Sequence, residues 1–337
     1  MDNSLSRRSF LGVTAGAGIV GATGLLTAGC SDAGGGGGNS VRIVNTAATA
    51  SLTINHLMDE LGYFKSFGVN PSIKNVSSGN QVVAALGSGS GDITVLSGFI
   101  GVFPAIEKGM NLKALAGTQV IATEAFFTGN PQMKSFHDLA GKTLGVGAVG
   151  SQLYDGFMAL LKKYDIPQKS VTFRNVGSSA DSFKAVMAKQ IDCGYGQVGD
   201  QALAQKKGVR MLNTVNGELP LYINQGAVAS AKAVKSKRKA LVKVLASYAK
   251  LFEYLTTPGS KSKYVAAYVA AGGSQDEGEI EWQFINQNKA YSPTLDLPVA
   301  KANYVQQLNV EAGSQKKVIP YEKYTDLSLR KEALALL

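Results

Sequence analysis

The sequence contains few of the residues that most often carry catalysis, metal binding or cross-linking. Its 337 residues include two cysteines, two histidines and one tryptophan. Neither His56 nor His137 has the spacing of a metal site or lies beside a serine or cysteine nucleophile motif. Cys193 lies in the run Ile-Asp-Cys-Gly-Tyr and is predicted to be a buried structural thiol. These absences disfavour a metal centre and a disulfide framework, so we expect stability to come from a hydrophobic core.

Positive charge is in excess, with a formal net charge of +10. The basic residues gather at residues 206–207, 232–243 and 261–263, and the middle group has the spacing of one solvated helix face. No aromatic residues alternate with them, as a platform for stacking bases would require. We therefore predict that this charge serves solubility and that the protein binds no nucleic acid. Steering of an anionic ligand is the alternative.

The first forty residues differ in composition from the rest. Ser-Arg-Arg-Ser-Phe-Leu at residues 6–11 precedes an uncharged, weakly apolar stretch that ends in Leu-Thr-Ala-Gly-Cys at residues 26–30. This order resembles a twin-arginine export signal with a lipobox, although Thr27 stands where leucine is usual. We predict a lipoprotein signal peptide over residues 1–29 and lipidation at Cys30, which would anchor an extracytoplasmic (periplasmic) protein to a membrane. An uncleaved anchor is the alternative, because about 20 residues can span a bilayer.

Two stretches about a hundred residues apart repeat one plan. In the first, Asn-Val-Ser-Ser-Gly-Asn at residues 75–80 leads to an apolar run and then to Gly-Asp-Ile at residues 91–93. In the second, Asn-Val-Gly-Ser-Ser at residues 175–179 leads to a similar run and then to Ile-Asp at residues 191–192. Each copy follows a proline-marked turn and a β-branched run, so a strand, loop, helix and strand are expected in both. The repeat predicts two α/β lobes with a ligand cleft at the carboxyl ends of their strands.

The remaining turns and linkers of the chain indicate how these lobes are connected. After the glycine-rich linker at residues 30–40, which should be flexible, residues 41–128 are assigned to lobe I and residues 129–225 to lobe II. The mostly helical residues 226–337 have no repeat partner and are expected to pack on lobe I. The chain would then cross the hinge twice, which allows the lobes to close on a ligand.

A Gly-x-Gly-x-x-Gly pattern at residues 145–150 lies between a predicted strand and a predicted helix. A dinucleotide site would also need an acidic residue at the end of the next strand, which instead ends Phe-Arg-Asn at residues 173–175. The pattern is therefore interpreted as a helix start whose backbone N–H groups, at Gly150, Ser151 and Gln152, suit a small anion. No cofactor is expected.

Other candidate contacts come from loops that should border the cleft. The loops of lobe I carry hydroxyl and amide groups but no charge, which suits a carboxylate, a sulfonate or a polar neutral group. The predicted ligand contacts in lobe I are Thr46, Ala47, Thr49, Ser51, His56, Ser97, Gly98 and Phe99. In lobe II they are Gly150, Ser151, Gln152, Tyr195, Gln197 and Asp200, although the Asp200 carboxylate could instead cap the following helix.

Four short motifs carry a family resemblance. They are Leu-Gly-Tyr-Phe-Lys at residues 61–65, Leu-Gly-Ser-Gly-Ser-Gly-Asp-Ile at 86–93, Ala-Ile-Glu-Lys-Gly at 105–109 and Asp-Leu-Ala-Gly-Lys at 138–142. Their order resembles the extracytoplasmic substrate-binding proteins of ABC transporters of the nitrate, sulfonate and taurine class. The resemblance implies an α/β, two-lobe periplasmic-binding-protein-like fold of type II, in which each lobe is a mixed sheet flanked by helices. It also implies ligand contacts in residues 46–51, 97–99 and 150–152.

One departure from that family bears on the ligand. Many members carry a tryptophan, an acid and a proline where this chain has Gln-Val-Gly at residues 197–199, so only Tyr195 nearby could replace the aromatic wall. The resemblance predicts a monomeric binding protein that delivers a small polar, anionic organic solute to an ABC permease. The alternatives are an exported enzyme that uses Asp200, His56 and Tyr154, and a binder of a pyrimidine resembling a thiamine precursor.

Overall fold

The computed structural model describes residues 40–337. The predicted export signal, Cys30 and all but the last residue of the linker lie outside the described residues. Within residues 40–337, no helix has both the length and the apolar character needed to cross a bilayer.

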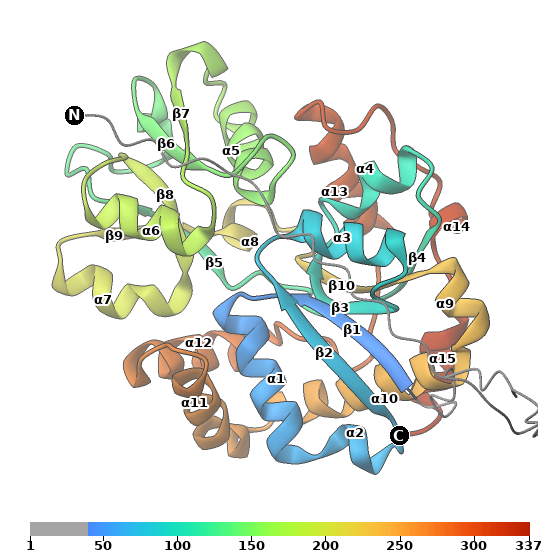
Figure 1. Ribbon diagram of the computed structural model, residues 1–337. Coiled ribbons are helices and arrows are strands. Elements are labelled where there is room, and N and C mark those ends of the chain that lie inside the picture. Colours follow the sequence, from blue (N-terminus) through green and yellow to red (C-terminus); the bar gives the residue numbers. More distant parts are fainter. Residues whose placement is uncertain (1–39) are drawn as a thin grey trace, which may run out of the picture. The chain divides into compact units, whose positions relative to one another are not determined.

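Lobe I is built on a five-stranded mixed sheet (Figure 1). Its strands, in spatial order, are β2 (Asn70–Val76), β1 (Ser40–Thr46), β3 (Ile93–Gly98), β10 (Gln225–Ser230) and β4 (Leu112–Gly117). β1 is parallel to β2 and β3, whereas β10 is antiparallel to both of its neighbours. The amino ends of β1, β2 and β3 therefore share one edge of the sheet, and the loops that could bind a ligand follow their carboxyl ends.

Lobe II repeats this arrangement in a second five-stranded sheet. Its strands, in spatial order, are β7 (Thr172–Asn175), β6 (Thr143–Val146), β8 (Cys193–Gln197), β5 (Glu124–Thr128) and β9 (Arg210–Thr214). β5 is antiparallel to β8 and β9, as β10 is to its own neighbours in lobe I. The predicted boundary at residue 129 left β5 in lobe I. Its pairing corrects that boundary, because β5 belongs to the sheet of lobe II.

The chain crosses between the lobes twice. Each crossing leads into the antiparallel strand of the lobe that it enters, which is β5 in lobe II and β10 in lobe I. Residues 118–123 run from β4 to β5, and residues 219–224 run from lobe II to β10. The crossings are bonded to each other, because Thr118 N–H donates to Gln225 O and Asn224 N–H donates to Gln119 O. The hinge that is crossed twice is thus a pair of adjacent segments.

The predicted strand, helix and strand of each repeat are confirmed. α3 (Gly79–Ser88) lies between β2 and β3, and α6 (Ser179–Met187) lies between β7 and β8. Serine caps both helices, because Ser78 Oγ accepts from Gln81 N–H and Ser178 Oγ accepts from Asp181 N–H. The spacing of Asn-Val and Ser that the two copies share therefore marks a strand end followed by a helix cap.

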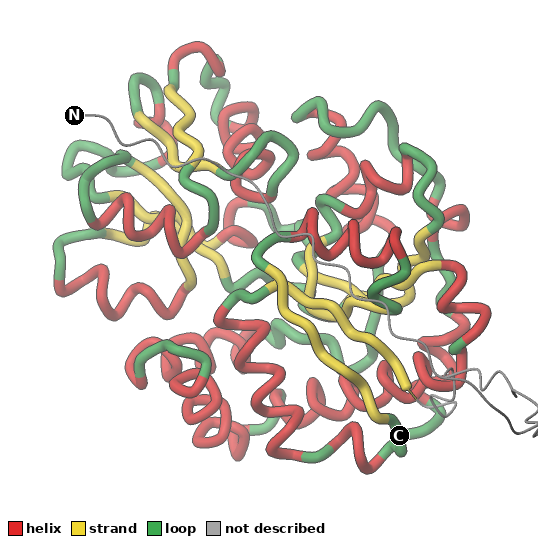
Figure 2. The backbone as a smooth tube through the Cα atoms, viewed as in Figure 1, coloured by secondary structure: helices red, strands yellow, loops and turns green. Residues whose placement is uncertain are grey.

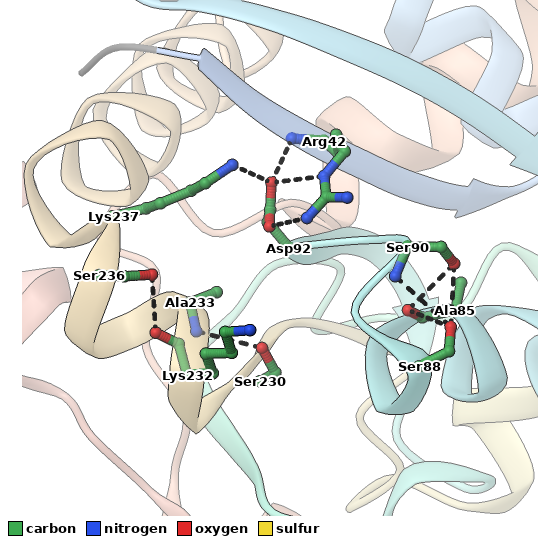
Figure 3. A network of polar contacts seen from close by, with 10 residues as sticks. All are labelled: Arg42, Ala85, Ser88, Ser90, Asp92, Ser230, Lys232, Ala233, Ser236 and Lys237. Atoms are coloured by element: carbon green, nitrogen blue, oxygen red, sulfur yellow. Dashed lines mark hydrogen bonds and ion pairs between the residues drawn. The ribbon is translucent and has the colours of Figure 1, made fainter. Parts of the chain in front are cut away.

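The aspartate of each repeat braces the strand that immediately precedes the repeat, β1 in lobe I and β6 in lobe II. Arg42 N–H donates to the Asp92 carboxylate at 2.8 Å, and Thr143 N–H donates to the Asp192 carboxylate at 2.8 Å. In lobe I the Asp92 carboxylate also accepts hydrogen bonds from the Arg42 guanidinium and from Lys237, as Figure 3 shows. Sequence similarity at these two positions therefore reflects one backbone contact made twice.

Helices cover both faces of each sheet (Figure 2). The longer ones before the return to lobe I are α1 (Thr49–Leu61), α3, α5 (Gln152–Lys163) and α6, and the short ones are α2 (Tyr63–Ser66), α4 (Val102–Glu107), α7 (Gln201–Lys206) and α8 (Val215–Glu218). After β10 come α9 (Ala231–Ser236), α10 (Arg238–Leu255), α11 (Lys261–Ala270), α12 (Gln275–Asn288), α13 (Val299–Glu311), α14 (Tyr321–Tyr324) and α15 (Ser328–Leu334). Short 3-10 turns lie at Phe136–Leu139, Gln168–Ser170, Val198–Asp200 and Pro258–Ser260.

The helical tail was expected to pack on lobe I, and part of it does. α10 packs on α2, α15 and β1, and α11 packs on α1. α12, however, contacts the 3-10 turn Val198–Asp200 and α7 of lobe II, and α13 contacts α5 of lobe II. A buried apolar cluster follows the same route, since it includes Phe99 of lobe I, Ile223 of the hinge, Phe126 of lobe II and Val305 of α13. The tail therefore bridges the two lobes.

Candidate ligand site at the junction of the lobes

The lobe I wall of the candidate site is the loop between β1 and α1 together with the end of β3. Thr46 Oγ1 and Ser51 Oγ each lie 3.4 Å from Leu96 O, to which they donate. Ser97 is buried, and its hydroxyl accepts from Thr94 Oγ1 at 2.8 Å. These predicted contacts are brought together by the fold, but their hydroxyls are engaged in holding the loop against the strand. Ala47 of the same loop is exposed, and its N–H donates to Val76 O.

The start of α1 has backbone donors without a side-chain cap. Its N-cap residue is Ala48, which has no side chain that could accept a hydrogen bond. The first N–H groups of a helix have no intrahelical acceptor, so those of Thr49 and Ala50 remain available. They carry the positive end of the dipole of a 13-residue helix, which favours an anionic group.

The start of α5 forms the corresponding wall of lobe II. Gly150 has a φ of +80°, which glycine adopts without strain, and Ser151 is the N-cap, whose Oγ accepts from Tyr154 N–H. The prediction that Ser151 offers a free N–H needs correction, because this group donates to Ala148 O at 2.9 Å. The available donors are instead the N–H groups of Gln152 and Leu153, the first two residues of the helix.

The glycine pattern before α5 is explained by close packing. A Cβ atom at Gly145 would lie 2.3 Å from the Ile191 side chain, and one at Gly147 would lie 2.5 Å from Ser151 Oγ. Real Cβ atoms essentially never approach other atoms so closely. The three glycines therefore allow β6 and the next turn to pack tightly, which accounts for the motif without a nucleotide.

The hinge contributes polar residues that the sequence analysis did not single out. Asn224 Nδ2 donates to Gln119 Oε1 at 2.7 Å and to Glu124 Oε2 at 3.2 Å. The Gln152 side chain also approaches the Glu124 carboxylate, and the Asn224 carbonyl packs against Gly98. Burial raises the pKa of Glu124, and the hydrogen bonds from its own backbone and from these amides only partly oppose this effect. Their sequence signal was weak, since it consists of isolated polar residues where the chain passes between lobes.

Gln197, at the end of β8, pairs with Glu124 of β5, and Asp200 lies in the turn that follows. Gln197 Oε1 accepts from Thr123 Oγ1 at 3.0 Å, and Gln197 N–H donates to Asp200 Oδ2 at 2.7 Å. The Asp200 carboxylate therefore closes the turn Val198–Asp200; it does not cap the following helix α7, which was one of the two roles that the sequence left open. Glu281 of α12 is fully buried next to this turn, and its Oε2 accepts from Gly199 N–H. Burial raises the pKa of Asp200 to about 6 and that of Glu281 to about 8.

The two aromatic residues among the predicted contacts are fully buried. The Phe99 ring stacks on Phe103, and the Tyr195 ring packs against Phe126 and Phe157. Alternation along β8 directs Tyr195 toward α5, where its hydroxyl faces Gly156. The Tyr195 ring, which the sequence suggested as the aromatic wall, belongs to the hydrophobic core, as does the Phe99 ring.

The remaining reactive side chains do not assemble into a catalytic or metal site. His56 is exposed in the second turn of α1, and Tyr154 packs on Phe173, with its hydroxyl accepting from Gln168. Cys193 is buried, which raises the pKa of its thiol. Within residues 40–337, no group of three histidine, cysteine, aspartate or glutamate side chains could hold a metal ion.

A hollow of about 860 Å³ opens beside the start of α5. It is shared by α3 and α4 of lobe I, the turn before α5 and the turn after α13. Its lining includes Asn80, Val83, Pro104, Met110, Val149, Gly150, Gly313 and Ser314. Only Gly150 belongs to both this hollow and the predicted contact set, so the hollow adjoins the candidate site without containing it.

Two lobes of mixed sheet that are joined by a double hinge form the periplasmic-binding-protein fold, as expected from the motifs. Residues 53–258 match the family described as NMT1/THI5 like. This match covers more than half of the chain, so the protein belongs to that family. No curated protein matches the sequence.

Solved structures share this fold at low sequence identity. The sulfonate-binding protein SsuA from Methylobacillus flagellatus KT aligns with a TM-score of 0.68 and 16% identity, over 88% of this chain and 94% of that chain. SsuA from Xanthomonas axonopodis pv. citri, solved with bound MOPS, aligns with a TM-score of 0.68 and 17% identity, over 86% and 98% of the two chains. The desulfurization enzyme DSZB aligns with a TM-score of 0.62 and 12% identity, over 88% and 99%. The fold thus occurs in binding proteins and in an enzyme.

Proposed function

We propose that this protein is the extracytoplasmic solute-binding component of an ABC importer, held at a membrane by a lipid on Cys30. Its solute is a small, polar, anionic organic compound of the sulfonate or carboxylate type, which it delivers to the permease. The observation that carries this proposal is the pair of helix starts, α1 in lobe I and α5 in lobe II, each with backbone N–H groups that have no intrahelical acceptor. Family membership and the export motif support the same function.

The acid group of the solute would bind the N–H groups at one or both helix starts. Backbone donors and helix dipoles can solvate a carboxylate or a sulfonate without a fixed counter-ion, which suits loops that contain no lysine or arginine. MOPS, which is bound to SsuA from Xanthomonas axonopodis pv. citri, is a sulfonate and illustrates the chemistry that this fold accommodates in that protein. Closure of the two lobes would then bury the solute.

The hinge side chains would select the remainder of the solute. Glu124 has amide neighbours and no cationic partner among the groups that influence its pKa. A hydrogen-bond donor on the solute would therefore gain from contact with its carboxylate, whereas a second acid group would be disfavoured. The side-chain amides of Asn224 and Gln197 can each donate a hydrogen bond to the solute or accept one from it.

The test is a thermal-shift screen of sulfonates, carboxylates, nitrate and pyrimidine precursors. A solute that binds the folded state raises the melting temperature increasingly as its concentration exceeds Kd. At least one sulfonate or carboxylate should do so, and small-angle scattering should show compaction with the same compound. A shift with pyrimidines alone would replace the anionic solute by the pyrimidine alternative, and no shift with any class would contradict a receptor function.

The positions of the three candidate acid and base groups do not favour an exported enzyme. Asp200 caps a turn, Tyr154 is bonded to Gln168, and His56 is exposed on α1 of the other lobe. General acid and base catalysis needs such groups within hydrogen-bonding reach of one substrate. Recovery of the bound compound chemically unchanged after prolonged incubation is the expected result.

A further inference from the structure

Positive charge gathers at the edge of lobe I where the described chain begins. β1 starts at Ser40, and its parallel neighbours β2 and β3 start at the same edge of the sheet. Lys237 donates to Asp92 at 2.8 Å just before β3, and Lys243 donates to Gly68 O at 3.2 Å just before β2. These contacts place the end of α9 and the start of α10 at this edge, and Figure 3 shows Lys232 and Lys237 there with Asp92.

The exposed lysines at this edge form what we term the basic patch. Its members are Lys65 on α2, Lys232 and Lys235 on α9, Lys239 on α10 and Lys331 on α15. None of the five forms an ion pair within residues 40–337. Three of the nearby acids are already engaged, because Asp92 pairs with Arg42 and Lys237, and both Asp326 and Glu332 pair with Arg238. Asp59, which lines a hollow together with Lys65, is the one neighbouring acid set against the five lysines in the described part of the chain. The edge therefore has an uncompensated positive charge.

Two exposed apolar side chains belong to the same region. Leu336 is 49% exposed and Leu337 is 53% exposed, directly after α15. The Arg238 to Glu332 ion pair joins α15 to the start of α10. Lysines around a small apolar tip are typical of surfaces that rest on lipid headgroups.

We propose that the basic patch rests on the anionic headgroups of a phospholipid bilayer. Cys30 lies ten residues before Ser40, and ten residues reach at most about 35 Å when fully extended. A lipid at Cys30 would therefore keep this edge close to the bilayer, where each lysine strengthens binding to an anionic surface about fivefold, or about 1 kcal/mol. The sequence predicted that the basic residues at 232–243, which include Lys232, Lys235 and Lys239, serve solubility, and their place beside the start of β1 changes that interpretation. The proposal is independent of the identity of the solute.

The test is vesicle flotation of the full chain carrying Cys30→Ser. Vesicles of phosphatidylcholine alone are compared with vesicles that also contain phosphatidylglycerol, at low and high salt. The triple variant Lys232→Glu, Lys235→Glu and Lys239→Glu is expected to bind the anionic vesicles at least about tenfold more weakly than its parent. High salt should weaken the binding of the parent and have little effect on the triple variant, because salt screens exposed charges.

A matched control separates the patch from net charge. Lys134, Lys169 and Lys207 are exposed on lobe II and form no ion pair within residues 40–337, so their triple change to glutamate alters net charge equally. This control should bind like the parent. Equal weakening by both triples, no weakening by the patch triple, or equal binding of the parent to both kinds of vesicle would overturn the proposal. A triple change of the patch lysines to glutamine, with unfolding in urea as a check, covers the case in which the glutamate variant folds poorly.

Discussion

The two lobes repeat one backbone plan but surround the aspartate of the repeat differently. Asp92 and Asp192 occupy the same place in the repeat, yet Asp92 accepts from two cations, Arg42 and Lys237. Asp192 accepts from backbone and from the neutral amide of Asn130. Burial alone would raise the pKa of Asp92, but hydrogen bonds from its two cationic partners outweigh that effect and lower the pKa to about 2. Lobe I thus contains a fully ionised, paired carboxylate at its base.

Around lobe II and the hinge, three carboxylates lack cationic partners, whereas the buried Glu218 of lobe II pairs with Lys163. Burial raises the pKa of Asp155 to about 7, that of Asp200 to about 6 and that of Glu281 to about 8. Burial of an unpaired carboxylate favours its neutral form, because the charged form loses its hydration. The comparison shows that the repeated aspartate keeps its hydrogen bond to the backbone in both lobes. Whether a cation also pairs with that aspartate depends on residues outside the repeat.

The largest expected effect is that of Asp92→Asn compared with Asp192→Asn. The first change removes the charge that pairs with Arg42 and Lys237, and it should lower the free energy of unfolding by about 3 kcal/mol. The second removes no ion pair, because the donors to Asp192 are uncharged, and should lower it by about 1 kcal/mol. Urea denaturation at pH 7 measures both.

The dependence of the free energy of unfolding on pH provides a control for the effect of Asp92→Asn. Because the pKa of Asp92 is lowered on folding, its stabilising effect is present above about pH 4, the ordinary value for aspartate, and is lost as the pH falls toward 2. The difference between the parent and Asp92→Asn should therefore shrink over that interval. Equal destabilisation by the two variants at pH 7 would show that the cationic partners contribute nothing.

Asp155 should show the opposite dependence on pH. Its side chain is buried, and its pKa is raised on folding from 3.8 to about 7. Stability from its neutral form is complete below about pH 4 and declines as the pH rises from about 4 to 7. Asp155→Asn cannot ionise, so this variant should exceed the parent by about 2 kcal/mol at about pH 8 and match it near pH 4. Urea denaturation across this range measures the difference, and parallel curves would contradict the unpaired state of Asp155.

The two helix starts can be compared with matched proline variants. Gln152→Pro and Thr49→Pro place proline at the first residue of α5 and α1, where it removes one N–H but fits the helix. Ser151 and Ala48, which precede them, already have the extended backbone that proline requires. Each variant should fold normally and bind the solute found by thermal shift about tenfold more weakly, the value typical of a lost charged hydrogen bond.

Alanine variants at the same positions separate the backbone from the side chain. Gln152→Ala and Thr49→Ala keep the N–H group, so they should bind nearly as well as the parent if the amide is the donor. Isothermal calorimetry with the same solute measures all four variants. Unchanged affinity in a proline variant would remove that helix start from the site and identify the other lobe as the one that holds the acid group.

Local patterns in the sequence predicted the fold far better than the site. The paired Asn-Val and Asp positions indicated strands and helices because they report backbone contacts within one repeat, such as Asp192 with Thr143. β5 was assigned to the wrong lobe because its own sequence does not indicate the sheet in which it pairs. It is an antiparallel strand that enters the lobe II sheet from the hinge. Tyr195 was given to the site because sequence position cannot show which face of β8 it occupies. The Glu124 and Asn224 pair, which we propose as solute contacts, has no local sequence signal because the two residues are 100 positions apart.

The smallest expected effect compares the serine caps of α3 and α6. Ser178 Oγ lies 3.1 Å from Asp181 N and also donates to the Asp181 carboxylate at 2.6 Å, whereas Ser78 Oγ lies 3.4 Å from Gln81 N. Ser178→Ala should therefore lower the free energy of unfolding by about 1 kcal/mol, and Ser78→Ala by about 0.5 kcal/mol. Urea denaturation at a common m-value resolves this difference, and substitution by glycine instead of alanine should recover part of each loss. If Ser78→Ala has the larger effect, these hydrogen-bond distances do not explain the relative stability of the two caps. Gln81, which accepts from Ser77, is then the next residue to change.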